Sequence, residues 1–142
     1  MIEHEYDAAG GVVLDGDRVL VLDRSSRSET RLPKGHVEPG ETDVEAAVRE
    51  VGEESGYVDV RVERDLGMQL IEFEAHPPEG PAWHIVRRER YFLMRLVSDA
   101  QAPRVDADQK FVPRWVPAVE AEAAMTYDNE REWVRRALDP RA

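Results

Sequence analysis

The segment Leu32–Tyr57, LPKGHVEPGETDVEAAVREVGEESGY, carries the signals of a loop followed by a helix. Thr42 and Glu45 have the spacing of a capping box, in which two side chains satisfy backbone amides at a helix start. Gly56 is a typical residue at which a helix ends. Between these signals, apolar residues recur at helical spacing: Val44, Ala47, Val48 and Val51. The segment therefore predicts a helix over residues 43–55 with one face packed on a core.

The opposite face of this predicted helix is acidic. At about 100° per residue, Glu50, Glu53 and Glu54 share a face, and Arg49 lies one turn before Glu53. On an exposed helix like-charge pairs cost only about 0.2–0.5 kcal/mol each, so a solvated acidic face is one interpretation. At a partly buried site, two charges about 5 Å apart repel by roughly 3 kcal/mol at an effective dielectric near 20. Such a cluster would favour Mg²⁺ or Mn²⁺, and the spacing alone leaves both interpretations open.

The spacing of these residues resembles the Nudix box, G-x5-E-x7-R-E-U-x-E-E-x-G-U. Gly35 and Glu41 match its first two positions, and REVGEESG at residues 49–56 matches the following ones. Only the last position departs, because Tyr57 stands where the family has an aliphatic residue. The resemblance implies the α+β Nudix fold, a mixed β-sheet sandwiched between α-helices (an α/β/α sandwich), as a single domain over residues 1–142.

The resemblance also implies roles for the residues of the box. Arg49 would orient the glutamates by ion pairing, and Glu41 would be an accessory ligand or a structural partner. The divalent metal ions, Mg²⁺ or Mn²⁺, would be held by the following groups: the carbonyl of Gly35 and the carboxylates of Glu50, Glu53 and Glu54. Glu53 is the first choice for the general base. A carboxylate outside the box is the alternative, with Asp106 and Asp108 as the nearest candidates.

Nudix enzymes hydrolyse a nucleoside diphosphate linked to another moiety, X, so the resemblance implies attack of water on phosphorus. The stretch LPKGHVEPGE at residues 32–41 resembles the diadenosine polyphosphate hydrolase branch. The alternatives are a pyrophosphatase for an oxidised nucleoside triphosphate such as 8-oxo-dGTP, one for a diphosphoinositol polyphosphate, and a non-catalytic ligand-sensing domain. Sensor domains usually lose box glutamates, and this chain keeps all of them.

Several residues outside the acidic face are candidates for substrate contacts. Lys34 and His36 flank the glycine of the box, and we expect both to contact the polyphosphate chain. Three aromatic residues are candidates for stacking on adenine, of which we expect one to do so: Phe73, Trp83 and Tyr91. Three arginines lie on a predicted strand, where at most two share a face: Arg87, Arg88 and Arg90. A solvated face is the alternative for these arginines.

The composition excludes several classes of protein. With 30 acidic and 19 basic residues the net charge is −11, which argues against a nucleic-acid binder. The small-molecule nucleotide expected as the partner is what the resemblance implies. There are no cysteines, which excludes a disulfide scaffold and suits the reducing cytoplasm. The N-terminus lacks the pattern of a signal peptide, and no apolar run is long enough to span a membrane. Monomer and homodimer both remain open.

The rest of the chain reads as strands followed by helices. Strands are predicted over residues 6–14, 18–23, 58–62, 66–73, 83–97 and 111–116, the first with a close backbone approach at Gly10-Gly11. Residues 25–30, 76–81 and 98–110 read as loops. A short helix is predicted over 118–125, and Thr126 or Asp128 is expected to cap a final helix. This order of elements indicates the α+β class.

Overall fold

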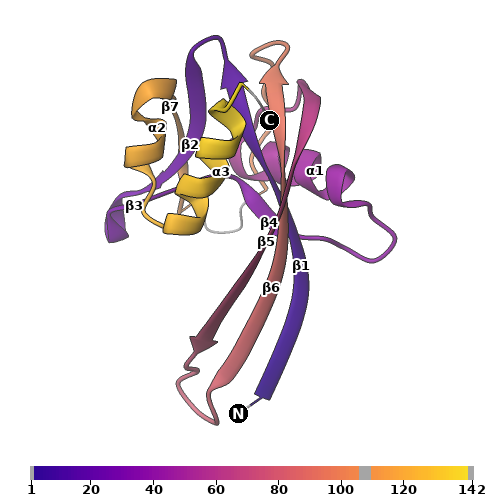
Figure 1. The fold of residues 1–142 in the computed structure, drawn as a ribbon, viewed down its shortest axis with the longest axis vertical. Coiled ribbons are helices and arrows are strands. Elements are labelled where there is room, and N and C mark those ends of the chain that lie inside the picture. Colours follow the sequence, from indigo (N-terminus) through magenta and orange to yellow (C-terminus); the bar gives the residue numbers. More distant parts are fainter. Residues whose placement is uncertain (1, 106–109, 141–142) are drawn as a thin grey trace.

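The computed structural model describes residues 2–105 and 110–140 (Figure 1). The helices are α1 (Asp43–Ser55), α2 (Ala118–Ala124) and α3 (Asp128–Leu138), with a 3₁₀ turn at Ser25–Arg27. The strands are β1 (Ile2–Asp15), β2 (Arg18–Arg24), β3 (Glu29–Arg31), β4 (Lys34–His36), β5 (Val60–Ala75), β6 (Trp83–Leu96) and β7 (Val112–Pro117). No helix in the described residues has the length and apolarity needed to cross a bilayer.

The seven strands form one mixed sheet between two layers of helices. The strand order is β3-β2-β1-β6-β5, with β4 paired to β1 and β7 paired to β2. The β1–β6 pair is parallel and the other pairs are antiparallel. Helix α1 covers one face, while α2 and α3 cover the other (Figure 1). The predicted sandwich of a mixed sheet between helices is therefore confirmed.

Strand alternation explains why the molecule has two cores. Val12 of β1 packs in the core beneath α2 and α3, which includes Trp133. Its neighbour Val13 points to the opposite face and packs in the core beneath α1, with Ala47 and Val51. Neighbouring strand residues face opposite sides, so a continuous apolar run such as Val12-Val13 is what a doubly covered strand requires.

The predicted helix over residues 43–55 matches α1. Thr42 and Glu45 form both bonds of the capping box, and Gly56 ends the helix with a positive φ of 87°. The final helix begins differently from the prediction. Its N-cap is Tyr127 with no side-chain cap, so the expected cap by Thr126 or Asp128 is wrong. The Thr126 hydroxyl instead accepts a hydrogen bond from the Thr30 amide, which ties α3 to β3.

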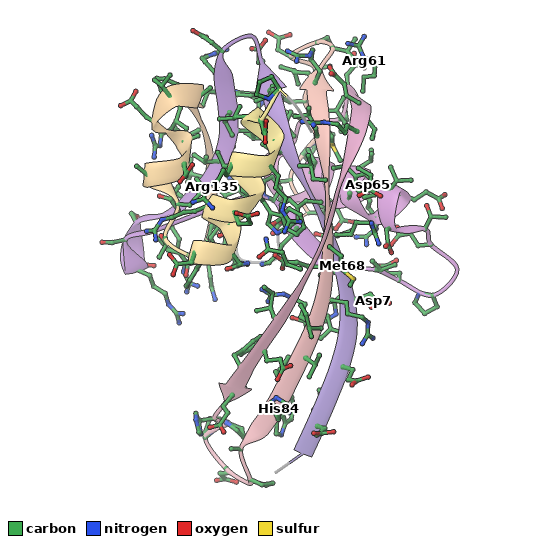
Figure 2. The ribbon with its side chains drawn as sticks, in the orientation of Figure 1. Asp7, Arg61, Asp65, Met68, His84 and Arg135 are labelled. Atoms are coloured by element: carbon green, nitrogen blue, oxygen red, sulfur yellow. The ribbon has the colours of Figure 1, made fainter. Side chains whose placement is uncertain are left out.

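Three long strands extend beyond the helix-covered body as an arm, made of residues 2–7, 69–75 and 83–88 (Figure 1). The two strands predicted over 58–62 and 66–73 are one strand, β5, whose register shifts at two bulges. One face of the arm is charged: Asp7 and His84 lie on it (Figure 2), and His84 contacts Glu3 and Glu72. The other face carries aromatic and aliphatic side chains and leads to a pocket described below.

Candidate active site

Strand β4 places the start of the box against β1. Ala9 pairs with Gly35, and Gly10 pairs with Lys34. A Cβ atom on Gly10 would lie 2.7 Å from Cζ of Tyr91 and 2.8 Å from Cβ of Lys34, so only glycine allows this approach. The predicted close backbone contact at Gly10-Gly11 is present.

Gly35 lies directly against the acidic face of α1. A Cβ atom added to Gly35 would overlap the carboxylate of Glu50. The absence of a side chain at Gly35 therefore lets the Glu50 carboxylate rest on the backbone of β4. This contact brings together two of the groups expected to bind metal.

Arg49 donates hydrogen bonds to three carboxylates at the acidic face. Its Nε donates to Glu41 Oε2 (2.7 Å), and its Nη1 donates to Glu50 Oε1 (2.7 Å) and Glu53 Oε2 (3.1 Å). Its Nη2 donates to the carbonyl of His36 (2.9 Å), which fixes the loop to the helix. These bonds raise the pKa of Arg49, and the bond from Arg49 lowers the pKa of Glu41 to about 2. Glu41 is thus joined to the acidic face through Arg49.

Glu54 occupies the most enclosed position of the three glutamates. Its Oε1 accepts a hydrogen bond from the Lys34 amide (2.7 Å). Burial raises the pKa of Glu54 to about 7, although that bond opposes the shift. Burial also raises the pKa of Glu50, against the effect of Arg49. Both carboxylates therefore sit where a negative charge is poorly solvated.

Within residues 2–105 and 110–140, no three carboxylate or imidazole groups converge closely enough to hold a metal ion as they stand. Arg49 holds Glu50 and Glu53, and the Lys34 amide holds Glu54. The residues nevertheless fit a divalent cation in type, because oxygen donors dominate and two of the carboxylates are desolvated. The contact of Glu50 with Gly35 also fits, since a side chain at residue 35 would fill that space.

A pocket of about 420 Å³ lies on the other side of β4 from this acidic face. Its walls come from β3 to β6 and α3: Arg31, Lys34, Ile71, Phe73, Arg87, Tyr127, Asn129 and Glu130. The Arg87 guanidinium lies 5.6 Å from the centre of the Phe73 ring, within cation–π range. Burial, with the charge of Arg31, lowers the pKa of Lys34 to about 8. Three cationic side chains thus line one cavity together with the rings of Phe73 and Tyr127.

A buried polar cluster supports this pocket and was not predicted from the sequence. The carboxylate of Glu89 is fully buried and accepts hydrogen bonds from Trp133 Nε1 (2.7 Å), Asn129 Nδ2 (3.0 Å) and Arg87 Nε (2.9 Å). Burial raises the pKa of Glu130, although the charge of Lys34 acts to lower it. Asn129 and Glu130 lie in the first turn of α3, where an acidic residue is ordinary, so the sequence gives no signal of a site.

The structure separates the three aromatic candidates. Phe73 lines the pocket and is 39% exposed. Tyr91 has no exposed surface, because its ring stacks on Trp133 with a centroid distance of 4.8 Å, so its face is closed to a base. Trp83 lies at the far end of the arm, stacked on His4. Of these three candidates, Phe73 is therefore the one placed to contact a ligand of the pocket.

The remaining candidates are divided between the two faces of the sheet. His36 packs on Tyr6, whose hydroxyl accepts a hydrogen bond from Arg87, so His36 lies next to the pocket. Arg88 and Arg90 are on the opposite face of the sheet from Arg87. Arg88 forms ion pairs with Glu5 and Asp7. Arg90 forms ion pairs with Asp43 and Asp65. Only Arg87 of the three contributes to the pocket. Asp106 and Asp108 lie outside the described residues.

Comparison with known proteins gives the family. A model of the NUDIX domain matches residues 5–137. The 8-oxo-(d)GTP phosphatase of Mycolicibacterium smegmatis is 30% identical over 118 residues, which are 83% of this chain and 33% of that protein. The RNA pyrophosphohydrolase of Pseudomonas putida is 29% identical over an alignment 152 positions long, which covers 90% of this chain and 86% of that protein. The chain thus spans only about a third of the length of the Mycolicibacterium smegmatis relative.

A solved structure supports the same fold. The crystal structure of an Ap4A hydrolase from C. elegans superposes with a TM-score of 0.62 and 24% identity, covering 92% of this chain and 93% of that one. At this identity the likeness speaks for the fold alone. With the family model matching almost the whole length, the chain belongs to the NUDIX domain family of hydrolases.

Proposed function

We propose that the chain is a metal-dependent pyrophosphohydrolase that cleaves a nucleoside diphosphate linked to X, with dinucleoside polyphosphates, diadenosine ones included, as the substrate class. The observation that carries this proposal is the shared position of Lys34. Its backbone amide binds Glu54 on the acidic side, and its side chain lines the cationic pocket. One short strand thus joins a site for cations to a site for anions, as a polyphosphate substrate bridged by metal requires.

The metal, Mg²⁺ with Mn²⁺ as the alternative, would be held by the Gly35 carbonyl and the carboxylates of Glu50, Glu53 and Glu54. When bound, it would neutralise phosphate oxygens and lower the pKa of water. Arg49 positions the carboxylates through the bonds described above. Glu53 is the proposed general base, since its side chain is 37% exposed against 13% for Glu50. Asp106 and Asp108 stay an untested alternative for this role.

The pocket would bind the part of the substrate that the metal ions do not contact. Lys34, Arg31 and Arg87 supply positive charge for the polyphosphate chain in a molecule whose net charge is −11. Phe73 supplies a ring for stacking on a nucleobase. His36 adjoins this group through Tyr6. We propose that the chain acts in the cytoplasm, as a monomer or a homodimer.

A second candidate is hydrolysis of an oxidised guanosine triphosphate. It is favoured by the likeness to the 8-oxo-(d)GTP phosphatase and by the hydrogen-bond acceptors that α3 contributes to the pocket. A triphosphate is shorter than a dinucleoside polyphosphate. The two candidates therefore differ in how many phosphates reach Lys34.

Hydrolysis in ¹⁸O-labelled water tests the proposal and separates the candidates. With diadenosine hexaphosphate and Mg²⁺, we expect the label on one product phosphate, with ATP or a neighbouring adenosine polyphosphate released. Rapid turnover of 8-oxo-dGTP without turnover of any dinucleoside polyphosphate would favour the second candidate. Turnover of neither class would contradict the proposal.

A further inference from the structure

Glu89 is a fully buried carboxylate in the middle of β6. Its side chain has no exposed surface, and it is not part of the pocket wall that the described residues form. A buried ion pair is seldom more stabilising than apolar side chains of the same volume. Stability alone therefore gives a weak reason for a carboxylate at this position, and the partners of Glu89 indicate another.

The two oxygens of Glu89 have different partners. Oε1 accepts hydrogen bonds from two neutral groups of α3, Nε1 of Trp133 (2.7 Å) and Nδ2 of Asn129 (3.0 Å). Oε2 accepts a hydrogen bond from Nε of Arg87 (2.9 Å), two residues earlier in β6. Helix α3 thus fixes the carboxylate through one oxygen, and the fixed carboxylate holds a cationic side chain of the pocket through the other.

The guanidinium of Arg87 is held on more than one side. Besides the bond to Glu89, its Nη1 donates to the hydroxyl of Tyr6 (3.4 Å), and its Cζ lies 5.6 Å from the centre of the Phe73 ring. The side chain lines the pocket and is 14% exposed. Its Nη2 has no hydrogen-bond partner among the residues that the structure describes. The N–H groups of Nη2 are therefore left for an anion in the pocket.

We propose that Glu89 is a positioning residue, which holds Nε of Arg87 so that the guanidinium is already oriented to bind the polyphosphate chain. This inference rests on the proposed function and adds how one cation of the same site is placed. A guanidinium is a planar group whose hydrogen bonds depend on its orientation. Fixing that orientation before the substrate arrives avoids the loss of side-chain entropy on binding. Glu89 itself does not touch the substrate.

The charge of Glu89 taken alone would have the opposite effect. A negative charge near a cationic pocket weakens the attraction for an anion, so removing that charge should tighten binding. Glu89→Gln separates charge from position. The oxygen of glutamine still accepts hydrogen bonds from Trp133 and Asn129, which turns its NH₂ group toward the Nε–H of Arg87. Two donors cannot bond to each other, so this variant keeps the contacts to α3 and releases the guanidinium.

Binding of inorganic tripolyphosphate, measured by calorimetry in metal-free buffer, tests the inference without a base or turnover. We expect Arg87→Ala to weaken binding by about 10- to 100-fold and Glu89→Gln to weaken it by about tenfold. In the Arg87→Ala background, Glu89→Gln should add no further loss, because no guanidinium is left to be oriented. The matched control is Glu63→Gln, which removes a carboxylate from ion pairs with Arg61 and Arg95 and should leave binding unchanged.

Two further measurements extend the test. With a dinucleoside tetraphosphate and Mg²⁺, the loss in Glu89→Gln should appear in KM, with kcat within about twofold of the wild type. Arg87→Lys keeps the positive charge but has no Nε–H for Glu89, so it should bind tripolyphosphate nearly as weakly as Arg87→Ala. This variant tests the role of orientation even if Glu89→Gln fails to fold, and wild-type affinity in Arg87→Lys would overturn the inference.

The remaining outcomes are also decisive. Unchanged or tighter binding of tripolyphosphate by Glu89→Gln would overturn the positioning role, and so would a wild-type protein that does not bind this anion. A loss of the same size in the Arg87→Ala background would assign the effect of Glu89 to the packing of α3. The proposed function fails separately: a chain that binds tripolyphosphate in this pattern but hydrolyses no nucleotide keeps the positioning role and loses the reaction.

Discussion

The two sides of β4 differ in charge and in how they are built. On the side of α1, three glutamates and one arginine within two turns of helix form an acidic site whose contacts are mostly local. On the other side, three cations and two aromatic rings line a pocket assembled from five elements. Metal bound to a phosphate chain does not distinguish one nucleotide from another, so the acidic site is suited to the reaction. The side chains of the pocket can contact the rest of the substrate, so the pocket is suited to the choice of substrate. We therefore expect mutations on the two sides of β4 to change the rate of the reaction and the choice of substrate separately.

The largest effect is expected on the acidic side. Glu53→Gln and Glu54→Gln should each lower kcat by roughly 10³-fold, because each removes a charged ligand and, for Glu53, the proposed base. The metal-free variants should melt no lower than the wild type, since a like charge is removed. Kinetics and thermal melts check both statements. Glu45→Gln in the same helix is the control, because glutamine also completes a capping box; full activity of either test variant would remove the site assignment.

The next effect tests whether the pocket reads the phosphate chain. Lys34→Ala removes the ammonium group that we propose forms a charge-assisted hydrogen bond with a substrate phosphate, and it should lower kcat/KM by about 10- to 100-fold. The loss should increase across dinucleoside substrates with four, five and six phosphates, which is the measurement. Arg61→Ala, at the end of the molecule away from the arm (Figure 2), should show no loss. An equal loss for all three lengths would mean that Lys34 only shapes the loop.

A smaller effect is expected for the Phe73 ring of the pocket. Phe73→Ala should raise KM by about tenfold with little change in kcat, because stacking is lost while the metal site is intact. Phe73→Trp should preserve KM. Tyr91→Phe should leave KM near the wild-type value, since the ring of Tyr91 is closed off by Trp133. If Tyr91→Phe raised KM as much as Phe73→Ala did, the separation of these residues would be wrong.

The smallest effect concerns the charged face of the arm, where His84, Glu3 and Glu72 line neither the pocket nor the acidic face of α1. Hydrogen bonds to Glu3 and Glu72 raise the pKa of His84. A folded-state pKa above the unfolded value of about 6.5 gives stability that is full below that value and is lost as the pH rises through the folded pKa. The melting temperature should therefore fall slightly more between pH 5.5 and 8 in the wild type than in His84→Gln. Identical pH dependence in both proteins would show that this contact adds nothing.

The difference between the two sides also explains what the sequence predicts. Helix α1 was predicted to the residue because its capping box, apolar face and Gly56 are all local signals. The groups of the acidic face were named correctly as neighbours, and Arg49 contacts both Glu50 and Glu53. Their role in metal binding remains a prediction.

The pocket was predictable only in part. Lys34 and Phe73 were named, but the choice among the aromatic residues depends on how far α3 extends along the sheet. Tyr91 and Trp83 lie on the same face of β6, and only Tyr91 is covered by Trp133. Glu130 and Asn129 carry no local signal, because their significance comes from partners many residues away, such as Leu32 and Glu89.

We propose that divalent metal at the α1 carboxylates is required for cleavage of a phosphoanhydride. ³¹P NMR of a dinucleoside tetraphosphate mixed with the protein measures this requirement, first in EDTA and then with excess Mg²⁺ in the same tube. We expect an unchanged spectrum in EDTA and, after Mg²⁺ is added, conversion to shorter nucleotides, with no conversion in Glu53→Gln. Equal hydrolysis before and after Mg²⁺, or hydrolysis by Glu53→Gln at the wild-type rate, would rule out this role of the metal.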